Sequence, residues 1–300
     1  EVTHNTTLYA SCQERSERFL QLSHFKMNNQ DAKTRCSVGI LTFNSAKTLR
    51  RTLKSVRDFT DIVISDGGST DATLEIAKEY GCRIFDQIAK HRPGPEPKHP
   101  ITDFSAEHNQ LLAVAKEEWY LRLDSDEYIS KELHDEIEEV VNANEFDGCM
   151  LSMNLQSPDA SVTYQLLRPV FQVRLLQRKK GEFQRPVHEH FVFRKSPKLK
   201  SLNGAWFVPI SKPDFATYKW AVNYRLNLSL NGLPKLTFFQ YIQRAFYLTT
   251  KRSLGIFIRA LVPRIVFWGS PQVPFFYVRN RLYSQWVMCK LLSKHYFERL

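Results

Sequence analysis

Residues 119–127, with the sequence WYLRLDSDE, contain the transition that decides the interpretation of this chain. An apolar run ends abruptly in three carboxylates within four residues. In an extended backbone, alternate side chains share a face, so Asp124 and Asp126 are expected to point the same way. Neighbouring carboxylates repel each other, and their oxygen atoms suit a hard cation such as Mg²⁺ or Mn²⁺. The alternative is a solvated strand end before a helix that Ser130 caps and that starts near Lys131.

The sequence before this motif alternates between strand-like and helix-like segments. Short apolar runs at residues 37–42, 61–66 and 83–85 indicate strands, and helical hydrophobic spacing follows the first two. A further helix is expected over residues 105–116, leading into the strand that ends at Asp124. This alternation predicts an α/β domain in which helices sandwich a mostly parallel sheet.

Polar residues stand at the ends of these predicted strands. Thr42 and Asn44 follow the first strand, and Asp66 ends the second. Open α/β sheets bind ligands outside the carboxyl ends of their strands, so these residues and the carboxylate cluster should meet at one crevice. Neither GxGxxG nor GxxxxGK[ST] occurs in the sequence. The ligand expected in this crevice is a nucleotide diphosphate. Asp66 would accept a hydrogen bond from an N–H of its base or from a hydroxyl of its ribose. Asp66 could instead cap the next helix, in competition with Asp71.

Four blocks, in their order and spacing, resemble the family 2 glycosyltransferases of GT-A fold. The resemblance covers about residues 36–195 and implies a Rossmann-like, mostly parallel sheet between helices. The blocks are ILTFN at 40–44, ISDGGSTD at 64–71, Asn109, and LDSDE at 123–127.

The resemblance implies a nucleotide-sugar site with a metal ion, Mg²⁺ or Mn²⁺, at the Asp-x-Asp block. Asp126 is the implied direct ligand, and Asp124 contributes to the metal site or contacts the ribose. Two positions depart from the family: His108 precedes Asn109 where Arg is common, and Ser125 separates the aspartates. The residues implied to contact the nucleotide sugar are Thr42, Asn44, Asp66, Asn109 and Asp124.

Residues 185–190, RPVHEH, form the next informative block. With the preceding segment 174–181, RLLQRKKG, they resemble a subgroup similar to bacterial lipopolysaccharide-core glucosyltransferases. In an extended segment, His188 and His190 would share one face, with Glu189 on the other. The resemblance implies that Glu189 is the general base and that His188 binds the metal or the diphosphate. The two roles could be exchanged.

The basic cluster in this region supplies two candidate contacts for the diphosphate. They are Arg174 and Arg178, although a basic run is commonly a solvated face. A diphosphate leaves readily only when cationic groups stabilise its developing charge. We therefore expect these arginines to support the metal in the predicted site.

The net charge of +11 is unevenly distributed along the 300 residues. Residues 216–300 contain thirteen Lys or Arg and one acid, a net charge of +12, which leaves −1 for residues 1–215. This step predicts a boundary before a basic, aromatic-rich helical region over residues 216–300. The resemblance implies a GT-A domain over 36–215, and the polar residues 1–35 are expected to form a partly ordered extension. Prolines are expected to break the basic region into short helices, at Pro263, Pro271 and Pro274.

Aromatic residues interleaved with Arg and Lys in the last region predict docking on an anionic membrane surface. The alternatives are a helical appendage packed on the catalytic domain and, least favoured, a nucleic-acid surface. The sequence has no apolar run of about 18–20 residues, no signal-like start, and five scattered cysteines. These features predict a cytoplasmic protein, peripheral at the inner face of the membrane.

Together these features predict a metal-dependent, inverting glycosyltransferase. It would move a sugar from a nucleotide-diphosphate sugar, with a UDP-sugar favoured, to a hydroxyl of a glycan or lipid-linked acceptor in cell-surface polysaccharide assembly. One alternative is a sugar-phosphate nucleotidyltransferase, which would be expected to have a glycine-rich phosphate loop that residues 39–44 do not contain. Another is a non-catalytic, glycosyltransferase-like protein that binds nucleotide or membrane, against which the intact carboxylates argue.

Overall fold

The structure is a computed structural model that describes residues 33–88, 101–212, 214–231 and 235–298. The chain divides into two compact units, residues 1–34 and 35–300. Most of the extension expected over residues 1–35 lies outside the described residues, as does most of the loop expected between 86 and 103. The description that follows therefore concerns the second unit.

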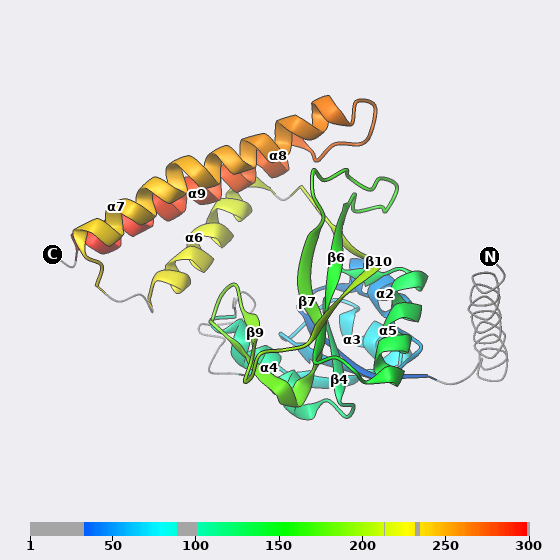
Figure 1. Cartoon of the computed structure of the whole chain (residues 1–300). Coiled ribbons are helices and arrows are strands. Elements are labelled where there is room, and N and C mark those ends of the chain that lie inside the picture. The colour runs from blue at the N-terminus through cyan, green and yellow to red at the C-terminus, as the bar shows by residue number, and fades with distance from the viewer. Residues whose placement is uncertain (1–32, 89–100, 213, 232–234, 299–300) are drawn as a thin grey trace, which may run out of the picture. The chain divides into compact units, whose positions relative to one another are not determined.

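An eight-stranded sheet forms the centre of this unit (Figure 1). Its strands are β1 (Thr34–Thr42), β2 (Phe59–Asp66), β3 (Arg83–Asp86), β4 (Trp119–Asp124), β5 (Tyr128–Ile129), β6 (Gly148–Gln156), β7 (Val170–Gln177) and β10 (Leu199–Pro209). The strand order is β3-β2-β1-β4-β7-β6-β10-β5. β1 pairs with β4, β2 with β3 and β6 with β10 in parallel, whereas β7 is antiparallel to both neighbours and β5 to β10. The predicted mostly parallel sheet is confirmed.

Helices cover both faces of the sheet. On one face, α2 (Ala46–Ser55), α3 (Thr73–Glu79) and α5 (Lys131–Ala143) bury leucine, isoleucine and valine side chains against the strands. On the other face, α4 (Phe104–Val114) packs with the hairpin of β8 (Gly181–Gln184) and β9 (His190–Phe193). Burial of both apolar faces fixes the sheet between two helical layers, as the α/β pattern predicts.

The end of β4 differs from the sequence prediction in one respect. The strand ends at Asp124, and Ser125 and Asp126 form a turn in which the Glu127 N–H donates to the Asp124 carbonyl at 3.1 Å. Because the backbone turns, the expectation that Asp124 and Asp126 share a face of an extended strand is wrong. The turn brings the chain into β5, after which the Ser130 side chain caps α5 by accepting the Leu133 N–H, as predicted.

Five helical segments follow the sheet: α6 (Phe215–Asn231), α7 (Phe238–Phe246), the π-helical turn η3 (Tyr247–Arg252), α8 (Ser253–Val266) and α9 (Phe275–Phe297). They share a small core of Leu230, Leu236, Leu248, Leu292 and Tyr296. The basic region is therefore helical, as predicted.

The expected breaking at the prolines is found only in part: Pro271 and Pro274 lie in the interruption between α8 and α9, where Pro274 is the N-cap of α9, but the helices are not short. Residues 238–266 form one continuous helical run, and α9 alone has 23 residues. Pro263 lies inside the last turn of α8, where its missing N–H costs only one intrahelical hydrogen bond. Among the residues that the structure describes, no helix combines the length and apolar character needed to cross a membrane.

The contact between β10 and the start of α5 makes one stability prediction. A Cβ atom at Gly204 would overlap the backbone N and Cα of Leu133, so Gly204→Ala forces α5 away from β10. We expect the free energy of unfolding, measured by urea denaturation, to fall by about 1–3 kcal/mol. The control is Gly255→Ala in α8, where the new methyl group would meet only Arg259 at 3.7 Å. Equal effects of the two substitutions would contradict the close packing of α5 on β10.

Candidate active site

Three strands end at one edge of the sheet. β1 ends at Thr42, β2 at Asp66 and β4 at Asp124, and Leu41 pairs with Asp124 across the β1–β4 ladder. The Thr42 hydroxyl donates to the Asp66 carboxylate at 2.7 Å, which joins the first two ends directly. The structure thus brings together strand ends that are far apart in sequence.

Two adjoining cavities open at this edge. The charged cavity, of about 770 Å³, is lined by ionisable residues that include Arg122, Asp124, Arg174, His188 and Glu189. The aromatic cavity, of about 370 Å³, is lined by Phe43, Gln87, Trp220 and Tyr224, among others. The lining that both share consists of Leu41, Phe104, Ser125 and Arg225. One elongated ligand can therefore occupy both.

Asp66 holds the loop that follows β2. Its carboxylate is 3% exposed and accepts the backbone N–H groups of Gly68 and Ser69 at 2.8 and 2.7 Å. It also accepts the hydroxyls of Thr42 and Ser69. Asp71, not Asp66, accepts the N–H of Thr73 at the start of α3. Thr42 and Asp66 therefore shape the floor of the site, and their direct contact with a nucleotide stays a prediction.

Asn44 links the first two loops. Its backbone has a φ of 49°, a left-handed conformation that asparagine tolerates better than most residues. Its side-chain oxygen accepts the Thr70 N–H at 2.8 Å, and its own N–H donates to the Ser69 hydroxyl. Asn44 thus fixes the rim of the site, whatever further contact it makes with a ligand.

The three carboxylates at the end of β4 have different surroundings. The Asp124 side chain is half exposed and lines the charged cavity. Burial and the charge of Asp124 raise the pKa of Asp126. Glu127 is 3% exposed, accepts the Asp124 N–H at 2.9 Å and lies 3.3 Å from the Arg174 guanidinium. Glu127 therefore fixes the turn, Asp124 lines the charged cavity, and Asp126 lies in the turn next to it without lining either cavity.

This donor set fits a divalent cation. Burial is the main cause of the raised pKa of Asp126 and the charge of Asp124 the second, so a cation beside the two side chains would favour the ionised form of Asp126. Carboxylate oxygens are the ligands that Mg²⁺ and Mn²⁺ prefer. Asp124 and Asp126 are thus suited to hold such an ion.

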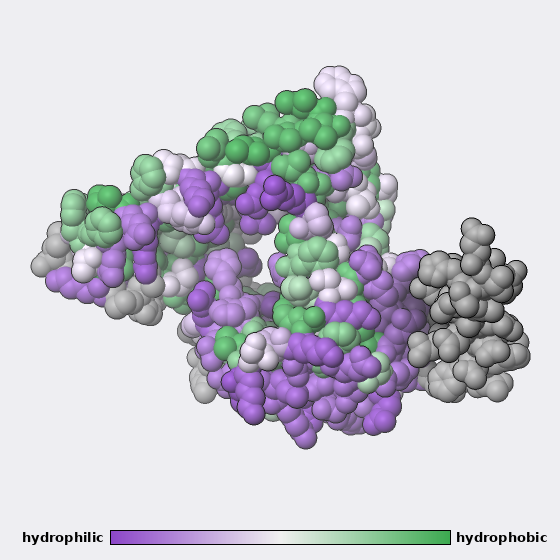
Figure 2. Space-filling model, in the orientation of Figure 1, coloured by the Kyte–Doolittle hydropathy of each residue, from purple (hydrophilic) through white to green (hydrophobic). Residues whose placement is uncertain are grey.

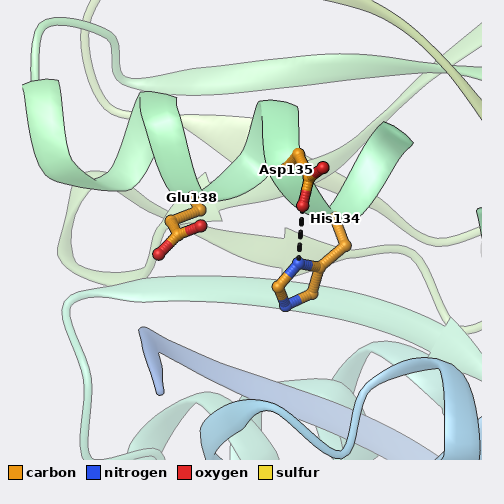
Figure 3. A group of neighbouring side chains, drawn as sticks. All are labelled: His134, Asp135 and Glu138. Atoms are coloured by element: carbon orange, nitrogen blue, oxygen red, sulfur yellow. Dashed lines mark ion pairs between the residues drawn. The ribbon is translucent and has the colours of Figure 1, made fainter. Parts of the chain in front are cut away.

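His188 is not part of a preassembled metal centre with these aspartates. Within the described residues, the one group of three His, Cys, Asp or Glu ligand atoms lying within 4.8 Å of one another is on α5, and it comprises His134, Asp135 and Glu138 (Figure 3). These residues line neither cavity, and Asp135 is paired with Lys131 at 3.1 Å. His188 lines the charged cavity, and metal binding by His188 stays a prediction.

The segment that contains His188 is bent, so the prediction of an extended segment is wrong. Arg185 and His188 have φ values of 75° and 57°, because the chain must reverse between β8 and β9. His188 is consequently exposed at the cavity, and His190 begins β9. Left-handed backbone at residues other than glycine costs of the order of 1–3 kcal/mol and is concentrated at functional sites. This geometry supports a site role for the segment.

Glu189 belongs to a buried charge network. Its side chain is 10% exposed, its Oε1 atom pairs with Arg122, and the same atom lies 3.7 Å from Nε2 of His108. Arg122 also lies 3.7 Å from Asp124. Burial, together with the charges of Arg122 and Arg174, lowers the pKa of His108 well below its usual range, so its imidazole is neutral. The network connects the metal-site aspartate to the predicted base.

Sequence reasoning missed both partners of Glu189. Arg122 was visible as a charged residue inside an apolar strand, a pattern that indicates a buried partner. His108 was noticed only as a departure from the family. No site role was predicted for Trp220, Tyr224 and Arg225 either, because α6 lies outside the segment that resembles the family. The stacked, i to i+4 pair of Trp220 and Tyr224 was the available signal.

Arg174 lies in the predicted place, and Arg178 does not. Arg174 lines the charged cavity and packs 4.2 Å from the centre of the Trp206 ring. The Arg178 guanidinium instead donates to the Glu117 carbonyl at 2.8 Å. Because β7 is antiparallel to β4, its C-terminal end lies beside Trp119, at the opposite edge of the sheet from the cavities. The prediction that Arg178 contacts the diphosphate is therefore wrong.

Asn109 is also engaged elsewhere. Its amide nitrogen donates to the Phe183 carbonyl and its oxygen accepts the Phe183 N–H, both at 2.8 Å. Neither cavity is lined by Asn109. The residue joins α4 to β8, and its contact with the nucleotide sugar stays a prediction.

Among the described residues, three guanidinium nitrogens next to the charged cavity have no hydrogen-bond acceptor, so an anion suits this cavity. In the part of the chain that the structure describes, Nε of Arg122 and both Nε and Nη1 of Arg174 are buried without a hydrogen bond, although Nη1 of Arg174 lies 3.3 Å from the Glu127 carboxylate in an ion pair. Buried donors are normally satisfied, and each unmet one is costly. A phosphate oxygen is a suitable acceptor for such guanidinium groups.

The family model described as glycosyl transferase family 2 matches residues 37–198, more than half of the chain, and the chain belongs to this family. The sheet and its two helical layers have the GT-A arrangement. The matched segment ends before α6. The narrower resemblance to lipopolysaccharide-core glucosyltransferases stays a prediction.

Relatives among known proteins cover part of the chain. The SPbeta prophage-derived glycosyltransferase SunS of Bacillus subtilis (strain 168) is 30% identical over 154 residues, which are 50% of this chain and 33% of SunS. An uncharacterized glycosyltransferase of Rickettsia bellii is 32% identical over 103 residues, 34% of this chain and 31% of the relative. The chain thus spans about a third of the length of these curated relatives.

Solved structures with a similar fold have low sequence identity. Residues 1–349 of S. aureus TarS, in complex with UDP, align with a TM-score of 0.43 at 15% identity, covering 89% of this chain and 92% of that one. The Mycobacterium tuberculosis glucosyl-3-phosphoglycerate synthase, with Mn²⁺, UDP and glucosyl-3-phosphoglycerate, aligns with a TM-score of 0.41 at 13% identity, covering 68% and 82%.

Proposed function

We propose that this protein transfers a sugar from a nucleotide-diphosphate sugar, with a UDP-sugar as the expected donor, to a hydroxyl of a glycan or lipid-linked acceptor in cell-surface polysaccharide assembly. The observation that carries the proposal is the pair of adjoining cavities at the ends of β1 and β4. In a family 2 member, this edge combines an aromatic compartment with a charged one that contains carboxylates and unsatisfied guanidinium donors.

The two cavities suggest how the donor lies. The nucleoside base stacks among Phe43, Trp220 and Tyr224 in the aromatic cavity, where the Gln87 amide nitrogen is held by the Thr42 and Ser65 carbonyls and its oxygen offers an acceptor. The diphosphate passes the shared wall at Ser125 and Arg225, and the sugar enters the charged cavity. This direction places the scissile bond near Arg122 and Arg174.

The side chains of the charged cavity then divide the chemistry. Arg122 and Arg174 bind the diphosphate and balance its developing charge as the bond to the anomeric carbon breaks. Glu189 accepts the proton of the acceptor hydroxyl while that oxygen attacks the opposite face of the carbon, so the configuration inverts. Asp124 and Asp126 would hold Mg²⁺ or Mn²⁺, which supplies further charge neutralisation at the leaving diphosphate when bound.

Asp126→Asn tests the metal site. We expect UDP to bind the wild-type chain more tightly with Mn²⁺ than with EDTA, and the substitution to reduce this metal-dependent gain by roughly tenfold or more. Isothermal titration calorimetry measures both affinities. The control is Asp135→Asn, which alters a carboxylate of the group on α5 that lines neither cavity. An undiminished metal effect in Asp126→Asn would remove Asp126 from the site.

Glu189→Gln tests the proposed base. We expect UDP affinity close to that of the wild type and a loss of turnover of roughly 100-fold or more, because the amide cannot accept the proton. Turnover is measured as UDP release from UDP-sugars with added glycan or lipid acceptors. Glu182→Gln, an exposed substitution in the same hairpin, is the control. Near-normal turnover would assign the base elsewhere, and a collapse of Mn²⁺ affinity would assign Glu189 to the metal site.

We further propose that the protein works at the cytoplasmic face of an anionic membrane. Large apolar side chains are exposed along the continuous helical run at spacings of three, four and eight residues, so they follow one face. They are Phe239, Ile242, Phe246, Leu254, Phe257, Leu261 and Ile265. Figure 2 shows hydrophobic residues gathered over α8. An exposed apolar stripe on a basic helix is typical of interfacial binding.

Co-sedimentation with vesicles tests this membrane contact. The full chain should bind vesicles containing anionic lipid more strongly than neutral ones, and salt should weaken binding, because each nearby cation contributes about 1 kcal/mol and is screened beyond about 8 Å. Replacing Phe257 and Leu261 by Glu should abolish most of the binding. Phe171→Glu, which changes an exposed aromatic residue on β7, should leave it unchanged. Equal binding by all three proteins would refute docking through the stripe.

A further inference from the structure

A third cavity, of about 510 Å³, lies within the C-terminal helices, and its residues are distinct from those of the charged and aromatic cavities. Its size falls in the range of about 300–1,000 Å³ that small-molecule sites occupy. The wall is mostly apolar, with two guanidinium groups at its edge. The residues that matter here are Leu230, Leu248, Met288, Leu292, Arg244 and Arg252.

The helical run is widened where it forms this wall. Tyr247, Leu248 and Arg252 belong to the π-helical turn η3, and all three line the cavity. Hydroxyl groups support the turn, because Thr249 donates to the Ala245 carbonyl and Ser253 to the Leu248 carbonyl. π-Helical turns are rare and occur frequently at functional sites. The π-helical turn, which side-chain hydroxyl groups stabilise, therefore shapes the cavity wall.

The cavity and the exposed stripe lie on different faces of the same run. Leu248 is 7% exposed and belongs to the core of the C-terminal helices, whereas Phe246 and Leu254 on either side of it are 67% and 59% exposed. A molecule that enters from the surface contacted by the stripe thus needs to pass only around the helix to reach Leu248. The short path around the helix favours an occupant that comes from a membrane.

The charge around the cavity is positive. The single acidic residue of residues 216–300 is Glu298, and its carboxylate lies 3.7 Å from Lys294. Arg244 and Arg252 are exposed at the cavity, and the complementary ligand group is an anion. Phosphate is the anion whose geometry guanidinium groups match best after carboxylate.

Helix α6 contributes side chains to both the apolar cavity and the charged cavity. Arg225 lines the charged cavity, and Ser229 and Leu230, about one turn further along α6, line the apolar cavity together with Arg252. His188 and Arg225 both line the charged cavity. A cationic strip therefore runs from the apolar cavity to the place where the sugar is transferred.

We propose that the cavity holds the hydrocarbon chain of a lipid-linked acceptor, with the acceptor's phosphate bound by Arg244 and Arg252. The inference rests on the proposed transfer reaction and names the class of acceptor for it. The phosphate end of such a lipid lies at the cationic strip, so the hydroxyl to be glycosylated extends toward Glu189.

Calorimetry with the full chain and dodecyl phosphate, below its micelle-forming concentration, tests this assignment. Dodecyl phosphate should bind at least about tenfold more tightly than inorganic phosphate, which lacks the chain, and than dodecyl maltoside, which lacks the charge; tenfold corresponds to about 1.4 kcal/mol. Leu248→Trp, which fills the cavity, and Arg252→Gln should each weaken binding by a similar factor. Two controls on the same run, Arg259→Gln and Ile258→Trp, lie outside the cavity lining and should bind as the wild type.

Each other outcome overturns the assignment. Equal affinity for inorganic phosphate means an anion site without a chain, and equal affinity for dodecyl maltoside means an apolar site without a phosphate. Unchanged binding in both Leu248→Trp and Arg252→Gln means that the lipid binds elsewhere, and the exposed position of Arg252 keeps that variant informative if the tryptophan variant does not fold. Mn²⁺-dependent UDP binding, measured in the same samples, separates the two proposals. If the wild type shows no Mn²⁺-dependent UDP binding, the proposed transfer reaction is wrong. If it binds UDP in this way but does not prefer dodecyl phosphate, only the proposed class of acceptor is wrong.

Discussion

The contact of the Glu127 carboxylate with the Asp124 N–H and the Arg174 guanidinium is the constraint on which the site depends. It closes the turn after β4, so that β5 can pair with β10 and α5 can start at Lys131. The same carboxylate holds Arg174 against the Trp206 ring, beside the charged cavity. A buried carboxylate is stable only with such partners, and breaking one contact would leave the others uncompensated. The turn, the arginine and the position of Asp124 are therefore set together.

Local signals explain what could be predicted from the sequence. The apolar run before Asp124 and the capping side chain of Ser130 fix a strand end and a helix start without reference to the rest of the chain. The position of the site could also be predicted, because neighbouring parallel strands have their carboxyl ends on the same side of the sheet. The direction of β7 could not be predicted, since an antiparallel strand within a mostly parallel sheet is decided by its neighbours. That single reversal carries Arg178 to the far edge of the sheet.

What else the sequence could not show concerns partners rather than residue types. The polar character of Asp66 and Asn109 was visible, but the sequence does not show that backbone groups already occupy their hydrogen-bonding atoms. Conversely, Arg122 and His108 became part of the site only when the fold placed them beside Glu189. Burial decides both cases. A side chain that must satisfy buried neighbours shapes a site, whereas a buried donor that lacks a partner, such as Nε of Arg122, leaves capacity for a ligand.

The donor and acceptor sides of the proposed reaction come from different parts of the chain. The carboxylates and buried arginines lie within the segment that matches the family, residues 37–198, whereas Trp220, Arg225 and the C-terminal cavity lie beyond it. Family membership therefore informs the donor chemistry and is silent on the acceptor. Arg225 lines both cavities from α6, so a change in the C-terminal helices alters the wall of the donor site as well. In the proposed reaction, acceptor and donor binding would be coupled through α6, which carries Arg225 on the wall of the donor site and Leu230 on the wall of the C-terminal cavity.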